Sequence, residues 1–182
     1  MIKIVVQSLR TFLALSLIVG LLYPLSVTLI GQTLWSHQAN GSLVERNQKI
    51  VGSELLAQKS ESMRLFWPRP SASDYGSIPS GASNQGPTSE ALKASVQERK
   101  AKGFANEMLF ASGSGLDPHI TKDAAISQLP RIVQARNMND NQKTALEEII
   151  KSSIEKRDLG FLGEERINVL RLNLKLVDVF GR

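Results

Sequence analysis

Apolar residues follow two patterns in this chain: they run almost unbroken near its start and recur with helix or strand spacing afterwards. No charged side chain lies between Arg10 and Glu45, and residues 11–30 contain twelve Leu, Ile, Val and Phe residues. About 20 such residues form a helix that crosses the roughly 30 Å hydrocarbon core of a bilayer. We therefore predict one transmembrane helix within residues 1–34 and one soluble domain over residues 35–182.

Two other interpretations of the apolar segment are open. A cleaved signal peptide has a shorter apolar core followed by small residues of A-x-A type, whereas this run ends in Leu34-Trp35-Ser36-His37. A buried core helix that is apolar on every face would need a larger protein around it. An uncleaved membrane anchor is therefore the favoured interpretation.

The charges on either side of the segment predict its orientation. Lys3 and Arg10 precede the span, whereas the first charge after it is Glu45. Because basic residues are retained on the cytoplasmic side, we expect a cytoplasmic N-terminus and an extracytoplasmic domain. Pro24, beside Tyr23 within the span, removes a helix hydrogen bond and is expected to kink the axis.

The first half of the soluble part predicts short elements separated by turn residues. Apolar residues in 49–53 predict a strand, whereas four prolines and three glycines exclude a regular helix or a central strand over 67–87. Thr88 is a candidate N-cap for a helix that ends near Arg99. Residues 108–110 predict a further short strand.

The second half predicts helices and a final strand. Thr121 can cap a helix that runs to Arg136 and that Pro130 should kink or divide. Asp140 can cap the next helix, whose Leu and Ile residues recur at helical spacing. Apolar residues near period two over 167–176 predict a terminal strand. The mixture of helices with few strands predicts an α+β domain.

Composition excludes several classes of function. The chain carries 22 basic and 17 acidic residues but no dense basic stripe with interleaved aromatic residues, so we predict no nucleic-acid partner. It has no cysteine, which excludes disulfides and thiolate chemistry. Its two histidines, His37 and His119, stand in no metal-binding pattern, so we predict no metal site.

Ser114, Asp117 and His119 lie close together in the sequence and are the residue types of a hydrolytic triad. Triad members normally come from separate elements, and residues 111–115 lack the first glycine of the G-x-S-x-G elbow. We therefore expect no catalytic residue here, but a capping bend in which Asp117 or His119 holds backbone groups. A membrane-tethered hydrolase and an envelope binding module remain the alternative functions.

Two roles fit the long segment 67–87: a surface loop packed by its own aromatic residues, or a loop that contacts a partner. Its end precedes a predicted helix, where backbone N–H groups can hold an anion. This makes a weak nucleotide- or anion-binding candidate of Ser80, Gly81, Ser83, Asn84, Gln85 and Gly86. We expect the chain to bind no cofactor of its own.

Several short motifs occur in a fixed order along the chain. The two most specific are S-G-S-G-L-D-P-H-I at 112–120 and R-I-N-V-L-x-L-N-L at 166–174, in which x stands for any residue. The other landmarks are Tyr23-Pro24 and residues 38–42, 51–55, 69–72, 83–87 and 128–131. In this order the motifs resemble the C subunit of the Kdp high-affinity potassium-transporting ATPase, a P-type pump of bacteria and archaea, over nearly the whole length of the chain.

The resemblance implies a non-catalytic accessory subunit of a potassium-uptake complex in a bacterial or archaeal plasma membrane. Its partners would be a channel-like potassium-binding subunit, an ATP-hydrolysing P-type subunit and a very small membrane peptide. Potassium and ATP would be handled by those partners. The C subunit of this family has been proposed to act as a catalytic chaperone that raises the ATP affinity of the pump subunit.

The same motifs nominate structural or interface residues. Most of them are polar, glycine or proline residues, which hold turns or contact partners more often than they form a core. They are Tyr23, Pro24, Asn40, Arg69, Pro70, Asn84, Gly115, Asp117, His119, Arg131, Asn168 and Asn173.

Overall fold

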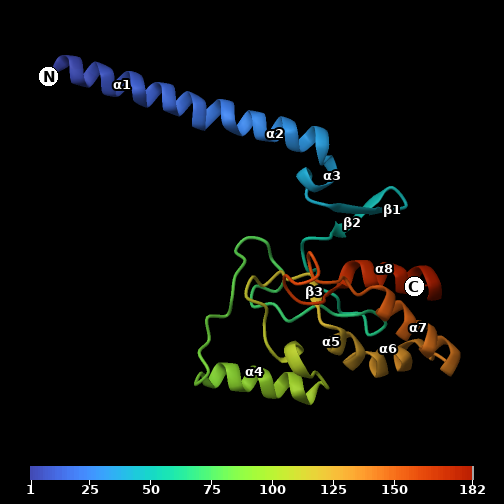
Figure 1. The fold of residues 1–182 in the computed structure, drawn as a ribbon. Coiled ribbons are helices and arrows are strands. Elements are labelled where there is room, and N and C mark those ends of the chain that lie inside the picture. Colours follow the sequence, from blue (N-terminus) through green and yellow to red (C-terminus); the bar gives the residue numbers. More distant parts are fainter. Residues whose placement is uncertain (182) are drawn as a thin grey trace. The chain divides into compact units, whose positions relative to one another are not determined.

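The structure, a computed structural model, describes residues 1–181 and divides into two compact units, Met1–Leu43 and Val44–Arg182. The first unit is helical (Figure 1, blue). Its elements are α1 (Ile2–Leu17), the π-helical turn η1 (Ile18–Leu22), α2 (Tyr23–Leu34) and the short α3 (Ser36–Ala39).

α1, η1 and α2 join into one apolar helix of 33 residues, Ile2–Leu34. None of its most apolar stretch of 18 residues is buried. By length and composition this helix could span a membrane, as the sequence predicts. The distortion expected at Pro24 takes the form of the π-helical turn directly before it. A wider turn relieves the crowding between a proline ring and the carbonyl four residues earlier, which is that of Gly20.

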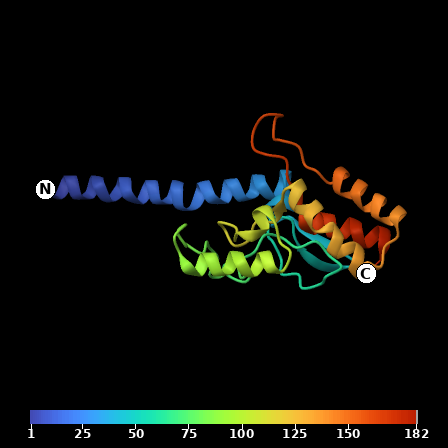
Figure 2. The ribbon, with the colours of Figure 1, turned by 90° about the horizontal axis from the view of Figure 1, so that it is seen from below.

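The second unit combines two small sheets with six helices over its described residues (Figures 1 and 2). The strands are β1 (Leu43–Arg46, which begins at the unit boundary), β2 (Lys49–Ser53), β3 (His119–Ile120) and β4 (Ile167–Asn168). The helices are α4 (Glu90–Ala101), the 3₁₀ helix η2 (Asn106–Leu109), α5 (Lys122–Ser127), α6 (Leu129–Arg136), α7 (Asp140–Ser152) and α8 (Val169–Phe180). This is the α+β architecture predicted from the sequence.

One of the two sheets is a local hairpin, whereas the other connects distant parts of the chain. β1 and β2 pair through a two-residue turn, Asn47-Gln48, in which both residues have positive φ, as tight hairpins need. β3 and β4 pair antiparallel, with His119 opposite Asn168 and Ile120 opposite Ile167. The second sheet therefore brings the end of the glycine-rich bend at 112–116 to the start of α8.

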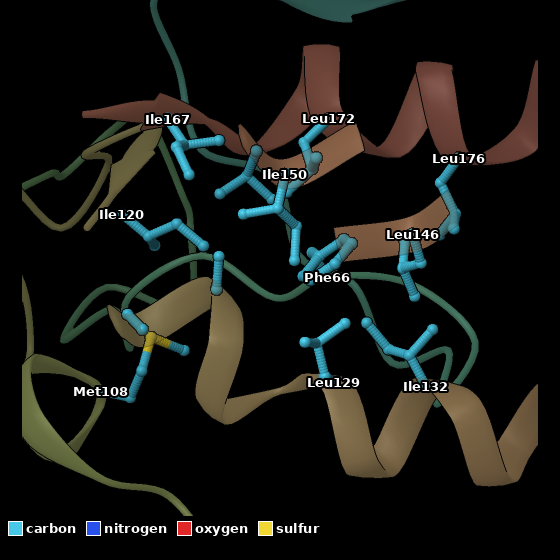
Figure 3. Close-up of a cluster of buried hydrophobic side chains, with 13 residues drawn as sticks. Phe66, Met108, Ile120, Leu129, Ile132, Leu146, Ile150, Ile167, Leu172 and Leu176 are labelled. Atoms are coloured by element: carbon cyan, nitrogen blue, oxygen red, sulfur yellow. The ribbon is translucent and has the colours of Figure 1, made fainter. Parts of the chain in front are cut away.

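The hydrophobic core lies where α5, α6, α7 and α8 meet the segment that follows β2 (Figure 3). Phe66, from that segment, is fully buried among the helices. Other fully buried side chains are Ile120, Ile132, Leu146, Ile167, Leu172 and Leu176. Every residue of this cluster belongs to the second unit, so that unit holds a complete core of its own.

Proline and threonine shape the helices under this core as the sequence predicts. Thr121 caps α5 by accepting a hydrogen bond from the Ala124 N–H. The helix then divides at Gln128, and Pro130 stands in the first turn of α6. A proline costs little there because the first N–H groups of a helix have no partner within it.

Two predicted strands are wrong. Residues 106–109 form the 3₁₀ helix η2, and only Ile167 and Asn168 of the predicted terminal strand are extended, whereas α8 begins at Val169. The apolar residues of 167–176 also fit a helix, because Val169, Leu172 and Leu176 fall on one helical face, and all three are buried. Asn168 starts that helix by capping it with its side chain.

Two predicted caps are displaced by one residue. Ser89, not Thr88, caps α4, and Asn139, not Asp140, caps α7. Asn139 is the N-cap because its side chain and that of Gln142 form a reciprocal capping box. Segment 67–87 contains no helix or strand, as its prolines and glycines predict.

Candidate functional site

Charged side chains and one histidine connect the β3–β4 sheet to the loops beside it, and we call this set the charged network: Glu54, Arg69, Asp117, His119, Glu155, Arg166 and Arg171. Asp117 lies between Arg69 (Oδ2 to Nη1, 3.6 Å) and His119 (Oδ1 to Nδ1, 3.7 Å). The other ring nitrogen of His119 faces Glu155 (Nε2 to Oε2, 3.8 Å). Both ring nitrogens of His119 therefore face a carboxylate.

Glu155 extends the network to two arginines. It lies 3.4 Å from Arg166 Nε and 3.4 Å from Arg171 Nη1, and its backbone pairs with that of Arg166. Arg171 also donates to the carboxylate of Glu54, and this hydrogen bond raises the pKa of Arg171. The network thus ties residue 54, the bend at 117–119, the strand-like segment at 155 and the start of α8 to one another.

Asp117 carries the clearest electrostatic signature of the network. Its burial raises the pKa of the carboxyl group, but the nearby His119 side chain, the hydrogen bond from the His119 backbone N–H and the charge of Arg69 outweigh that effect. The pKa of Asp117 consequently lies below its ordinary value. Asp117 is therefore held as an anion at neutral pH, where it serves as an acceptor.

The residues of the alternative triad do not form a nucleophile and base. Ser114 Oγ accepts the N–H of Leu116, and Asp117 Oδ1 accepts the N–H of His119. Within residues 1–181 no hydrogen bond joins Ser114 to His119. Because the imidazole faces Asp117 on one side and Glu155 on the other, the geometry is that of a capping bend.

Gly115 sits where this bend meets the long loop. Its φ is +72°, and a Cβ there would come within 2.8 Å of Ser73 Oγ and 2.9 Å of the Gly81 carbonyl. The neighbouring Ser112 N–H donates to the Pro70 carbonyl (2.9 Å). Glycine is the residue that fits this position, because its backbone adopts positive φ and it leaves room for the close approach.

Arg131, Gln128 and Asn173 hold segment 63–67, and we call these three residues the clamp. Arg131 donates to the carbonyls of Met63 (2.7 Å) and Leu65 (2.9 Å). Its guanidinium lies 3.8 Å from the centre of the Trp67 ring, a cation–π contact. Burial lowers the pKa of Arg131 to about 10, so the group keeps its charge at neutral pH.

The two amides of the clamp act on the backbone beside Phe66. Asn173 accepts the Phe66 N–H (2.7 Å) and donates to its carbonyl (2.9 Å). Gln128 does the same for Trp67, at 2.8 and 3.0 Å. The clamp thus supplies the hydrogen bonds that a neighbouring strand would supply, which lets an irregular segment deliver Phe66 to the core.

The anion-binding candidate of segment 80–86 is only partly assembled. Ser83 and Gln85 line a cavity of about 370 Å³ together with Arg99 and Leu92 of α4. The other candidates, Ser80, Gly81, Asn84 and Gly86, are not among its lining residues. Arg99 Nη1 donates to the Leu109 carbonyl, so this guanidinium already has one partner.

The remaining candidates lie in turns and caps. Asn40 exchanges side-chain hydrogen bonds with Gln32 and donates to the Ser36 carbonyl, all within the first unit, where Tyr23 and Pro24 are exposed on the long helix. In the second unit Asn168 caps α8 and donates to the Glu54 carbonyl (2.8 Å). Among residues 1–181 no three acidic or histidine side chains are grouped to hold a metal ion.

Sequence reasoning missed several members of these two sites. Glu54, Gln128 and Arg166 lie inside quoted motifs, so closer attention to their polar side chains would have found them. Glu155 and Arg171 carry no local signal of this kind, because their pairing depends on the tertiary approach of α8 to the segment after α7.

Comparison with known proteins gives a consistent result. The family model described as "K+-transporting ATPase, c chain" matches residues 5–178. A potassium-transporting ATPase KdpC subunit of Leptospira interrogans is 45% identical, covering 98% of this chain and 96% of that protein. Subunits of the same name from Methylococcus capsulatus and Mycobacterium tuberculosis are 43% and 41% identical, covering 93% of this chain and 94% and 95% of theirs.

These matches cover both units. The family model begins within the candidate membrane helix and ends within α8. It therefore includes the charged network, the clamp and the glycine-rich bend at 112–116. The chain therefore belongs to the KdpC family, the c chains of K+-transporting ATPases.

Proposed function

We propose that this chain is the non-catalytic accessory subunit of a high-affinity, ATP-driven potassium-uptake complex. In that complex it assembles with a channel-like potassium-binding subunit, an ATP-hydrolysing P-type subunit and a small membrane peptide. The observation that carries the proposal is the family match over residues 5–178, which includes most of the candidate span and the whole core.

The candidate site supports an accessory role. The charged network and the clamp are built from side chains that hold each other or the backbone, as in the contacts of Asp117 with His119 and of Asn173 with Phe66. Catalysis by a serine nucleophile needs a base in hydrogen-bond reach of its hydroxyl, and Ser114 lacks that arrangement among the described residues. These contacts stabilise the shape of a binding domain.

The favoured arrangement has the N-terminus in the cytoplasm and the domain outside the membrane. Lys3 and Arg10 before the span support this orientation. An outer domain would lie over the entrance of the channel-like subunit, where it would stabilise the complex and shape the access of potassium. Cysteine substitutions at Lys3 and Glu164, labelled from outside intact cells with a membrane-impermeant maleimide, test this: Glu164→Cys should react and Lys3→Cys should not.

A second mechanism is that of a catalytic chaperone that raises the ATP affinity of the pump subunit through segment 80–86. The cavity beside Ser83, Gln85 and Arg99 favours it, because a cation and several polar groups meet there. The proposed topology opposes it, since ATP lies in the cytoplasm. Arg99→Gln tests the mechanism. If this cavity is the chaperone site, the substitution should raise the KM of the pump for ATP and leave kcat unchanged.

The primary test of assembly is co-purification. The chain, tagged at its C-terminus, is extracted from membranes in mild detergent, and the bound proteins are identified by mass spectrometry. Recovery of a P-type ATPase together with a channel-like potassium-transport protein supports the proposal. Recovery of the chain alone contradicts it.

Ser114→Ala and His119→Ala separate an accessory subunit from a tethered hydrolase. A hydrolase would lose turnover with its fold intact. An accessory subunit with a capping bend loses thermal stability or assembly instead, because the hydrogen bond from Leu116 or the contacts of the imidazole are removed.

A further inference from the structure

The second unit contains an apolar cavity that the proposed function does not use. It has a volume of about 470 Å³ and lies between the β1–β2 hairpin, the segment that follows β2, and α8. Pockets of about 300 to 1,000 Å³ commonly hold small ligands. The apolar lining includes Val51, Leu56, Phe66, Val169, Leu174 and Val177.

Cationic side chains surround this apolar lining. Two of them already have acidic partners: Arg46 pairs with Asp178, and Lys59 pairs with Asp74 at 3.0 Å. Arg64 is exposed and, within residues 1–181, its side chain has no ion pair or hydrogen bond. A positive charge at the edge of the cavity is therefore left without an acidic counterpart in the described chain.

Arg136 supplies a second such charge, and a partly buried one. Its Nε donates to the Arg64 carbonyl (2.8 Å) and its Nη1 to the Gly181 carbonyl (3.0 Å). Its Nη2 is buried and has no hydrogen-bond partner within the described residues. Burial and the nearby charge of Arg64 lower the pKa of Arg136. A buried donor without a partner destabilises the folded protein, so an acceptor at this nitrogen would be stabilising.

We propose that this cavity binds a single-chain anionic amphiphile of the fatty-acid class, with its alkyl chain among Leu56, Leu174 and Val177 and its carboxylate on Arg64 and Arg136. Burial of methylene groups among these apolar side chains favours binding of an alkyl chain. A carboxylate pairs with guanidinium groups through charge-assisted hydrogen bonds.

Charge and shape favour this occupant over others. A cationic amphiphile would meet two guanidinium groups that have no acidic partner among residues 1–181, and a neutral one would leave Arg136 Nη2 without a charged acceptor. A chain with a candidate membrane span also encounters bilayer amphiphiles at high local concentration. The proposal is independent of the proposed transport role, because it concerns the isolated chain.

Photolabelling of the full-length chain tests the proposal. The chain is reconstituted in nanodiscs of a zwitterionic lipid, and a diazirine-bearing palmitate analogue is added and activated by light. Labelled peptides are identified by mass spectrometry. We expect labels on the peptides that contain Leu56 and Leu174, competed by palmitate but not by hexadecanol or hexadecyltrimethylammonium.

Three variants sharpen the test. Arg64→Gln removes one of the two cations without removing an ion pair or side-chain hydrogen bond among residues 1–181, and it should weaken competition by palmitate about tenfold. Val177→Trp fills the cavity and should abolish labelling there. Arg157→Gln, an exposed cation outside the cavity lining, is the matched control and should change nothing. Circular dichroism checks that each variant stays folded.

Three results would overturn the proposal. The first is labelling confined to the long N-terminal helix. The second is equal competition by hexadecanol, which would make the cavity a general apolar surface. The third is unchanged labelling in Val177→Trp, which would place the ligand elsewhere.

Discussion

The helical core and the long loop with α4 achieve order by different means. In the core, Leu172, Leu176 and Ile132 are fully buried. In the stretch from residue 71 to 103, which we call the arm, no residue is buried, although it includes the complete helix α4. Both regions belong to one compact unit, so the presence of a regular helix does not indicate where stability resides.

The arm depends on polar contacts instead of burial. Ser71 Oγ accepts the N–H groups of Ser73 and Tyr75, and the Tyr75 hydroxyl donates to the Arg69 carbonyl. Such contacts contribute about 1 kcal/mol each, whereas a buried leucine contributes several. The arm is therefore the low-stability part of the domain, which suits a surface that adapts to a partner.

The largest contrast is expected from one substitution made in both regions. Leu172→Ala leaves a cavity in a fully buried position of α8 and should lower the free energy of unfolding by about 3–5 kcal/mol. Leu92→Ala in α4 is the matched control and should cost about 1 kcal/mol or less, since Leu92 is only partly buried. Urea unfolding measures both, and equal costs would remove the distinction between core and arm.

Substitution in the clamp should cause the second-largest loss in the free energy of unfolding. Asn173→Leu leaves both the N–H and the carbonyl of Phe66 without partners and should cost about 2–4 kcal/mol. Asn84→Leu, an exposed asparagine of the arm whose φ of +52° strains a larger residue, should cost about 1–2 kcal/mol. Thermal unfolding compares the two, and a smaller loss for Asn173 would show that the clamp does not secure Phe66.

Gly115 tests the contact between the two regions. Gly115→Ala places a Cβ against Ser73 and the Gly81 carbonyl at positive φ and should cost about 2 kcal/mol. Gly113→Ala, two residues away, meets no atom within 4 Å and should be nearly neutral. Hydrogen exchange should show faster opening of the arm in Gly115→Ala alone. Uniform destabilisation of the whole domain would contradict a local role.

The smallest effect on the free energy of unfolding is expected from protonation of Asp117 at low pH. The folded-state pKa of Asp117 is lowered, so its stabilisation is present above the unfolded-state value of about 3.9 and is lost as the pH falls through the folded value. The cost of Asp117→Asn should therefore be present at about pH 7 and shrink at about pH 3. Asp74→Asn, in the arm, should change stability little at either pH because that side chain is 74% exposed. A pH-independent cost for Asp117 would exclude the electrostatic explanation.

The sequence predicted the elements that local chemistry determines. Thr121 and Pro130 start and divide the helices where expected, and the apolar run at residues 11–30 lies in one long helix. The predicted terminal strand was wrong because the apolar residues in 167–176 fit both the strand period of two and the helix period of about 3.6. The side chain of Asn168 caps the N-terminus of α8 and thereby favours the helix.

The candidate site was only partly predictable. Asp117, His119, Arg131 and Asn173 were nominated through motifs, but their contacts depend on tertiary structure. Glu155 reaches His119 and two arginines only because the segment after α7 returns to β4. No periodicity or spacing in one sequence encodes such an approach.

The most direct test of the central claim is the potassium-stimulated ATPase activity of the purified transport complex, measured with this chain and without it. An accessory subunit predicts that activity at low potassium is lost without the chain and returns when the full-length chain is added back. Full activity in its absence would contradict the account.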